Sequence, residues 1–147
     1  PAPDLPDVPL SVGGIFLFFF FGGFFLYSGI YAAMGAIATT DQEAQQLQWP
    51  VFMPLIVAIM MMGAVIQDPD STAAVAGSLI PFTAPVVMPM RAAIGEVPAL
   101  HLIVSALGVI ATTCVTLWLG ARIYRVGVLE TGKRASAKEV WSWVRSK

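Results

Sequence analysis

The chain has 147 residues, a net charge of −1 and a mean hydropathy of +0.78. Hydrophobic residues make up 57% of it and charged residues only 12%, whereas soluble domains carry about 25% charged residues. This composition predicts an integral membrane protein embedded in the lipid bilayer. Seven of the eight basic residues lie at or after Arg122, so the rest of the chain lacks the basic face that nucleic-acid binding requires.

The first predicted elements are a linker and a membrane span. Residues 1–9 contain four prolines and two acids, which predicts an extended extracytoplasmic segment rather than a helix. Residues 10–38 carry no charge and exceed the length that a helix needs to cross a hydrocarbon core of about 30 Å. Its phenylalanine-rich centre, residues 16–25, is expected to face lipid or fill packing space.

A short polar helix and a second span are expected next. Thr40 followed by Glu43 forms a capping-box pattern, which predicts a polar helix over residues 41–49 at the membrane surface. Pro50 is expected to interrupt that helix and to begin a separate span over residues 50–67.

Residues 72–98 are mostly apolar, and prolines recur every four residues between positions 81 and 89. Asp68 to Ser71 forms a turn signal, and Pro81, Pro85 and Pro89 would break a single spanning helix. Irregular backbone at membrane depth requires protein or water around it. We therefore expect two short helices joined by a proline-rich reversal, forming an external re-entrant hairpin, in preference to a fourth span.

Arg91 is a cation within this apolar segment and should need a polar partner. Glu96, Asp68, Asp70 and exposed carbonyls at the hairpin turn are the candidates. The pairing could fix the hairpin structurally, or it could form part of an external gate. The candidate gate and hairpin residues are Pro81, Phe82, Pro85, Met88, Pro89, Arg91 and Glu96.

The third span is predicted over residues 99–121, followed by a basic tail over residues 122–147 that contains a short amphipathic helix. Basic residues favour the cytoplasmic side, so the C-terminus should be cytoplasmic and residues 68–98 external. The acids and bases expected at a cytoplasmic contact are Asp41, Glu43, Arg122 and Arg125. Cys114, within the third span, is expected to be a small buried apolar residue.

No catalytic, cofactor or metal site is expected. Residues 127–134, GVLETGKR, match seven positions of a phosphate-binding loop. Arg134 occupies the eighth position, where Ser or Thr would ligate magnesium, and the segment follows a membrane helix instead of a strand. Hydrolase motifs and metal-type Cys/His spacings are absent from the sequence.

Four motifs together resemble the C-terminal half of type-2 ABC exporter permeases, particularly the NatB-like sodium-efflux branch. They are DQEAQQ at 41–46, PVFMP at 50–54, PFTAPVVMPMR at 81–91 and RIYRVG at 122–127. The resemblance implies the last three spans and external re-entrant pair of a permease in the cytoplasmic (inner) membrane. It also implies partnership with the N-terminal half and with a separate ATPase subunit.

The function expected from this resemblance is ATP-driven export of sodium or another small substrate. The resemblance implies that a first span, an extracytoplasmic insertion and the main ATPase-coupling helix are not within these 147 residues. A non-transporting accessory subunit, packed against a larger membrane complex, is therefore the alternative.

Overall fold

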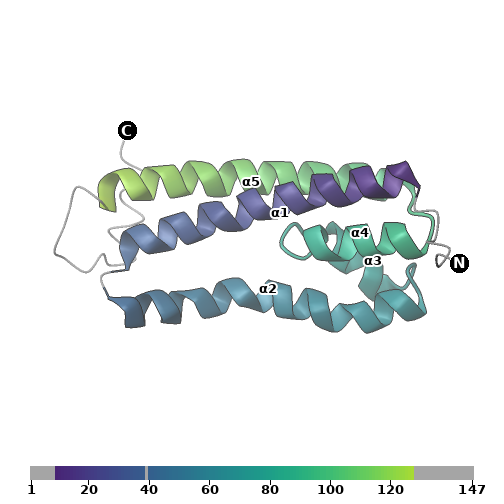
Figure 1. Cartoon of the computed structure of the whole chain (residues 1–147), viewed down its shortest axis with the longest axis horizontal. Coiled ribbons are helices and arrows are strands. Elements are labelled where there is room, and N and C mark those ends of the chain that lie inside the picture. Colours follow the sequence, from purple (N-terminus) through teal and green to yellow (C-terminus); the bar gives the residue numbers. More distant parts are fainter. Residues whose placement is uncertain (1–8, 39, 128–147) are drawn as a thin grey trace, which may run out of the picture.

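The computed structural model describes residues 9–38 and 40–127. Three long helices run along the molecule, and two short helices lie between α2 and the α1–α5 pair (Figure 1). We name the two ends of this bundle the Asp41 end, where α2 begins, and the Arg91 end, where α2 finishes and α5 begins. The helices are α1 (Leu10–Ile37), α2 (Asp41–Gln67), α3 (Thr72–Leu79), α4 (Ala84–Ile94) and α5 (Ala99–Gly127).

Within the described residues, three helices are long and apolar enough to cross a membrane: Leu10–Ile37, Asp41–Gln67 and Ala99–Ile123. Their 28, 27 and 25 residues exceed the roughly 20 that a span of the hydrocarbon core requires. The described chain contains helices and no strands, as a membrane-embedded backbone that must satisfy its own hydrogen bonds requires. The predicted all-helical, multi-pass architecture is confirmed.

The expected division of α2 at Pro50 is wrong. One continuous helix extends from Asp41 to Gln67 and contains both Pro50 and Pro54. Each proline removes one backbone donor and leaves the flanking turns intact, which membrane helices tolerate. The predicted cap does form, because the Glu43 N–H donates to the Thr40 hydroxyl at 3.2 Å.

Helix α5 also extends beyond its predicted end, to Gly127 instead of residue 121. The charges of Arg122 and Arg125 do not end it, because a helix can continue into water once its apolar part has crossed the membrane. Residues 1–8, 39 and 128–147 lie outside the described structure. The predicted linker, the amphipathic C-terminal helix and nearly all of the GVLETGKR segment fall there.

Glycines allow α1 and α5 to pack closely. A Cβ atom added to Gly120 would lie 2.7 Å from the Gly29 carbonyl oxygen, and one added to Gly22 would lie 2.8 Å from Val109 Cγ1. The Thr113 hydroxyl donates to the Gly22 carbonyl across the same interface at 3.4 Å. Small residues support close approach in lipid, where no hydrophobic driving force brings helices together.

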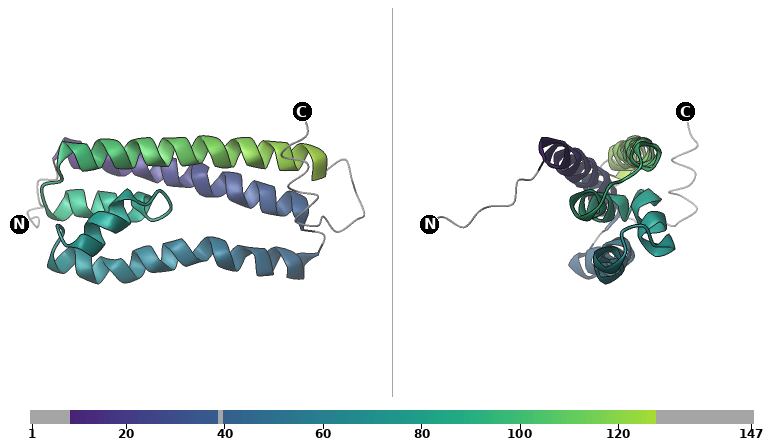
Figure 2. Two further views of the ribbon diagram at one scale, coloured as in Figure 1. Left: turned by 180° about the vertical axis from the view of Figure 1, so that it is seen from behind. Right: turned by 90° about the vertical axis from the view of Figure 1, so that its right-hand side faces the viewer.

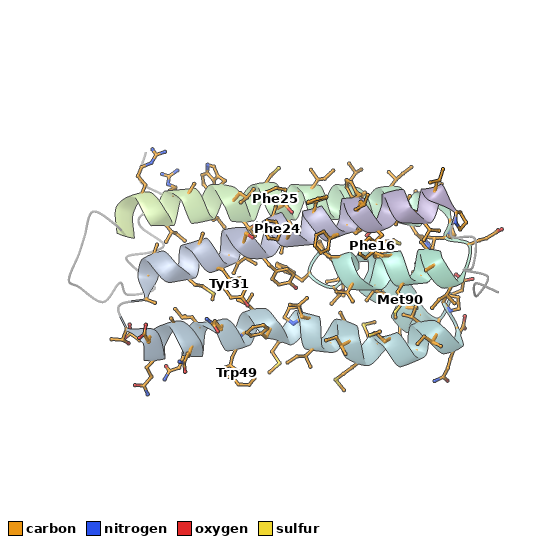
Figure 3. All side chains as sticks on the ribbon, in the orientation of Figure 1. Phe16, Phe24, Phe25, Tyr31, Trp49 and Met90 are labelled. Carbon is orange, nitrogen blue, oxygen red and sulfur yellow. The ribbon has the colours of Figure 1, made fainter. Side chains whose placement is uncertain are left out.

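Large apolar side chains cover the outside of the bundle. Phe19 is buried in the core, whereas Phe24 and Phe25 are about half exposed and Trp49 is 62% exposed. Figure 3 shows Trp49 pointing away from the other helices. Cys114 is exposed, so the expectation of burial is wrong. Apolar character does not distinguish inside from outside in a membrane span, because lipid-facing positions are equally apolar.

Candidate functional site

The α3–α4 pair (residues 72–94) enters the bundle at the Arg91 end, reverses direction at residues 80–83 and returns (Figures 1 and 2). The predicted turn at 68–71 precedes it, where the Asp70 N–H donates to the Asp68 carboxylate at 2.9 Å. Ser71 then caps α3, its hydroxyl accepting from the Ala74 N–H at 3.3 Å. Local hydrogen bonds thus fix the turn that leads into the pair and the start of α3.

Of the three prolines, only Pro81 lies in the expected reversal, at residues 80–83. Pro85 occupies the first turn of α4, where a backbone N–H has no intrahelical partner and proline is well tolerated. Pro89 lies inside α4 and is buried. The spacing of four residues therefore fits one helix that begins just before Pro85.

Two of these prolines pack against glycines of the long helices. A Cβ on Gly23 of α1 would lie 2.7 Å from Pro85 Cβ, and one on Gly108 of α5 would lie 3.4 Å from Pro81 Cγ. Pro85 and Pro81 thus pack the pair closely against α1 and α5. A residue larger than glycine at position 23 would force the ring of Pro85 away.

Helix α4 separates two clusters of buried apolar residues. On one side Ala84 and Met88 pack with Phe19 of α1 and Val109 of α5. On the other, Val87 packs in a cluster that joins α4 to α2 and α3; its members are Ala58, Val65, Ala74 and Val87. Helix α4 therefore connects α2 to the α1–α5 pair, as the end-on view in Figure 2 also shows.

Arg91 is completely buried and donates three hydrogen bonds. Its Nε donates to the Pro69 carbonyl at 2.6 Å, one terminal nitrogen to the Ser78 hydroxyl at 2.8 Å and the other to the Asp70 carboxylate at 3.2 Å. We call these four residues the Arg91 clasp. The clasp ties the end of α4 to the last turn of α3 and to the turn that follows α2.

The clasp continues into the long helices through further side chains. The Ser105 hydroxyl of α5 donates to the Ser78 carbonyl at 2.6 Å, and the Ser78 hydroxyl donates to the Val75 carbonyl at 2.8 Å. At the reversal, the Tyr27 hydroxyl of α1 donates to the Phe82 carbonyl at 2.7 Å. Hydrogen bonds thus anchor the pair at its base and at its tip.

The charges of the clasp are unequally exposed. The Arg91 side chain is 0% exposed, whereas the Asp70 side chain is 73% exposed. Water can therefore solvate the carboxylate, while the guanidinium depends on protein oxygens for its hydrogen bonds. Of the predicted partners, Asp70 is confirmed, whereas the carbonyl that accepts from Arg91 is that of Pro69, in the turn before α3 and not at the reversal.

The sequence of this chain matches a known family of membrane proteins. Residues 5–122 match the model of the ABC-2 family transporter proteins, which covers most of the chain. The chain belongs to the ABC-2 transporter family. It is thus a multi-pass membrane protein of the type that supplies the membrane component of a transporter.

Two curated relatives resemble this ABC-2 family chain. An uncharacterized protein of Methanocaldococcus jannaschii, MJ1024, is 26% identical over 124 residues, covering 84% of this chain and 31% of the relative. The uncharacterized Bacillus subtilis protein YhaP is 27% identical over 137 residues, covering 93% of this chain and 33% of the relative. The chain therefore spans about one third of each relative's length. No solved structure matches it significantly.

The structure of this ABC-2 family chain brings six of the seven candidate hairpin residues together in the α3–α4 pair. Glu96 is the exception, because it lies on the connection to α5 and is exposed. No ion pair joins Glu96 to Arg91, whose partners all lie in residues 69–78. The six that lie together are Pro81, Phe82, Pro85, Met88, Pro89 and Arg91.

The four residues predicted at a cytoplasmic contact lie at the Asp41 end, remote in sequence and in the bundle from the clasp (Figure 1). Asp41 and Glu43 occupy the first turn of α2. Arg122 lies over the Trp118 ring, 5.3 Å from its centroid, and Arg125 is exposed in the last turn of α5. Acidic and basic side chains thus share one end of the bundle.

Sequence reasoning missed the polar side chains that hold the α3–α4 pair besides Arg91 and Asp70. Ser78, Ser105 and Tyr27 are isolated polar residues in apolar runs, and side chains of this kind often bond between membrane helices. That general tendency marks them as candidates, but it does not identify their partners. Among the described residues, no group of three or more His, Cys, Asp or Glu side chains is arranged to hold a metal ion.

Proposed function

We propose that this chain is the C-terminal permease portion of an ATP-driven exporter, similar to the NatB-like branch, with ATP hydrolysed by a separate subunit. The α3–α4 pair is then a re-entrant hairpin that enters from the outside of the cytoplasmic membrane. The Arg91 clasp holds this hairpin as an external gate. Sodium or another small substrate is exported.

The observation that carries the proposal is a fully buried arginine that holds two short helices, α3 and the proline-containing α4, inside a membrane bundle of the ABC-2 family. A buried charge at such a site is costly, and such charges in membrane proteins commonly mark ion or substrate pathways. The apolar tip at residues 80–83 ends part-way along the bundle (Figure 1), which suits a gate that opens by withdrawal.

The orientation follows from the basic residues beyond Arg122, which favour a cytoplasmic C-terminus. Cysteine labelling tests it, after native Cys114 has been replaced by Ala. A cysteine at Ser71 should react with an impermeant maleimide in intact cells, and a cysteine at Ser146 should react only after permeabilisation. Reaction of both positions in intact cells would contradict the proposed topology.

Transport is tested with the native complex in inverted membrane vesicles. ATP-dependent sodium accumulation should occur, and Arg91→Leu should reduce it while leaving the co-purifying ATPase bound, because the clasp lies at the end opposite Asp41 and Arg122. Asp68→Asn is the matched control, since Asp68 belongs to the same turn but does not contact Arg91. Purification without any ATPase, and vesicles without ATP-dependent transport of any small substrate, would contradict the proposal and favour an accessory subunit.

A further inference from the structure

A cavity of about 640 Å³ lies at the Arg91 end, between the first turns of α1, the end of α4 and the start of α5. Its walls come from three segments that are distant in sequence: residues 9–15, residues 92–97 and Leu102. Arg91 does not line it, because the guanidinium group is directed to Pro69, Asp70 and Ser78. The cavity is therefore separate from the clasp.

One part of the cavity is apolar. Ile15, Val97 and Leu102 line it and also pack against the buried cluster that contains Phe19 and Met88. This wall is continuous with the core of the bundle, so an apolar group placed there would contact apolar side chains. Burial of apolar surface would favour its binding.

The other part of the cavity is lined by the last residues of α4 and by Glu96. The carbonyls of Ala92, Ala93 and Ile94 belong to the last turn of α4, where no intrahelical donor is available. Within residues 9–38 and 40–127, no donor bonds to these carbonyls or to the carboxylate of Glu96, which lines the cavity beside them. A helix C-terminus carries partial negative charge, which adds to the full charge of Glu96.

The charges at this site favour a cation. No Lys or Arg lines the cavity, and Arg91, the basic residue of this end in the described chain, is held by its three acceptors. A bare metal ion does not fit, because the cavity is far larger than an ion and the described residues lack a cluster of three metal-ligating side chains. An ammonium group, with up to three donors, suits the carboxylate and the carbonyls together.

We propose that this cavity binds an amphiphilic organic cation, its ammonium group on Glu96 and the α4 carbonyls and its chain against Ile15 and Leu102. Two sources carry this chemistry: a free alkylamine and a membrane lipid with an ammonium headgroup. The site does not depend on the proposed export activity, because it rests on the shape and charge of the cavity alone.

The test uses an alkylammonium probe with a photoreactive diazirine at the end of its chain. The protein, with any subunits that co-purify, is placed in phosphatidylglycerol nanodiscs, irradiated with the probe and analysed by mass spectrometry. Saturable labelling should concentrate at residues 12–15 and 97–102. Glu96→Gln should raise the half-saturating concentration about tenfold, as expected for loss of a charge-assisted hydrogen bond.

Three controls make the test decisive. Asp68→Asn removes an exposed charge at the same end, outside the cavity, and should leave labelling unchanged. The alkanol of equal length should label lipid-facing helices without this preference. Val12→Trp should fill the cavity and abolish the preferred labelling even if Glu96→Gln prevents folding. Equal labelling by alkanol and ammonium probes, or folded Glu96→Gln protein with unchanged labelling, would overturn the proposal.

A lipid titration distinguishes the two sources. When phosphatidylethanolamine replaces part of the phosphatidylglycerol, competition for labelling at residues 12–15 and 97–102 would assign the cavity to a lipid headgroup. Labelling that persists unchanged would assign it to a free amine. Either result supports the cation site, because both require the preferred labelling that Glu96 confers.

Discussion

Prolines occur both in the first part of α2 and in the α3–α4 pair, but their surroundings differ. Pro50 is exposed on α2 and Pro54 is half-buried, and the helix continues through both. Pro85, by contrast, lies against Gly23 of α1, and Pro89 is buried. The comparison shows that a proline in one region costs a single helical hydrogen bond, whereas in the other it contributes packing between helices.

Loss of the clasp should have the largest effect on the Arg91 end. Arg91→Leu removes three hydrogen bonds at once, and at about 1 kcal/mol net for each we expect a loss of about 2–3 kcal/mol of unfolding free energy. Unfolding by SDS in mixed micelles measures this loss. No buried charge is stranded, because Asp70 is largely exposed.

Two variants separate geometry from charge at the clasp. Arg91→Lys keeps the charge but cannot reach three acceptors in a planar arrangement, so it should be intermediate. Asp70→Asn keeps an oxygen that can accept from Arg91 but removes the counter-charge of a buried guanidinium, so its loss should be smaller than that of Arg91→Leu. An Asp70→Asn loss equal to that of Arg91→Leu would show that the ion pair alone stabilises the region.

The contact between Gly23 and Pro85 should be the next most sensitive. Gly23→Ala places a Cβ 2.7 Å from Pro85 Cβ, and we expect the overpacking to cost about 1–2 kcal/mol in the same SDS titration. Gly35→Ala, on the same helix with no atom within 4 Å of the added Cβ, is the matched control and should not destabilise. Equal effects at both positions would mean that the prolines do not wedge the pair against α1.

Tyr27→Phe should give a smaller loss. It removes the hydrogen bond to the Phe82 carbonyl at the tip while keeping the ring, so about 1 kcal/mol is expected. Hydrogen exchange at residues 80–83 should also rise, because the tip loses its anchor on α1. Tyr31→Phe, one turn further along α1, is the control. Unchanged exchange at residues 80–83 in Tyr27→Phe would show that the reversal is stable without the hydrogen bond from α1.

The smallest changes in unfolding free energy are expected for two proline substitutions, and these changes should have opposite signs. Pro50→Ala restores a donor in an exposed part of α2 and should stabilise by about 0.5 kcal/mol. Pro85→Ala restores no intrahelical bond, because the residue is in the first turn of α4, and it loses the contact with Gly23. Stabilisation by both substitutions would remove the distinction between the two regions.

The long elements could be predicted from the sequence because hydropathy and length determine them directly. The uncharged run at residues 10–38 predicts the start of α1 correctly and its C-terminal end to within one residue. The break at Pro50 could not be predicted correctly, since the same residue ends some helices and lies inside others. A proline can remain inside a helix when the backbone carbonyl that loses its donor is satisfied by its surroundings. Those surroundings depend on tertiary structure.

The candidate site was predictable in part. A single Arg in an apolar segment indicates that it needs a polar partner. The turn at residues 68–71 supplies two candidate carboxylates, those of Asp68 and Asp70. The choice of Asp70 over Asp68 and Glu96 depends on how α4 returns alongside α3, and so does the recruitment of Ser78. The position of α4 beside α3 depends in turn on its packing between two apolar clusters. Apolar patterns in membrane helices do not reveal which helix faces meet.

The close pairing of α1 with α5 also constrains how the protein is made. The bond between Thr113 and Gly22 joins residues 91 positions apart, so α1 leaves the ribosome long before its partner exists. Until α5 is inserted, Gly22, Gly29 and the backbone that they expose must face lipid or an insertion factor. The contact between α1 and α5 is thus a late, non-local step in the assembly of this bundle.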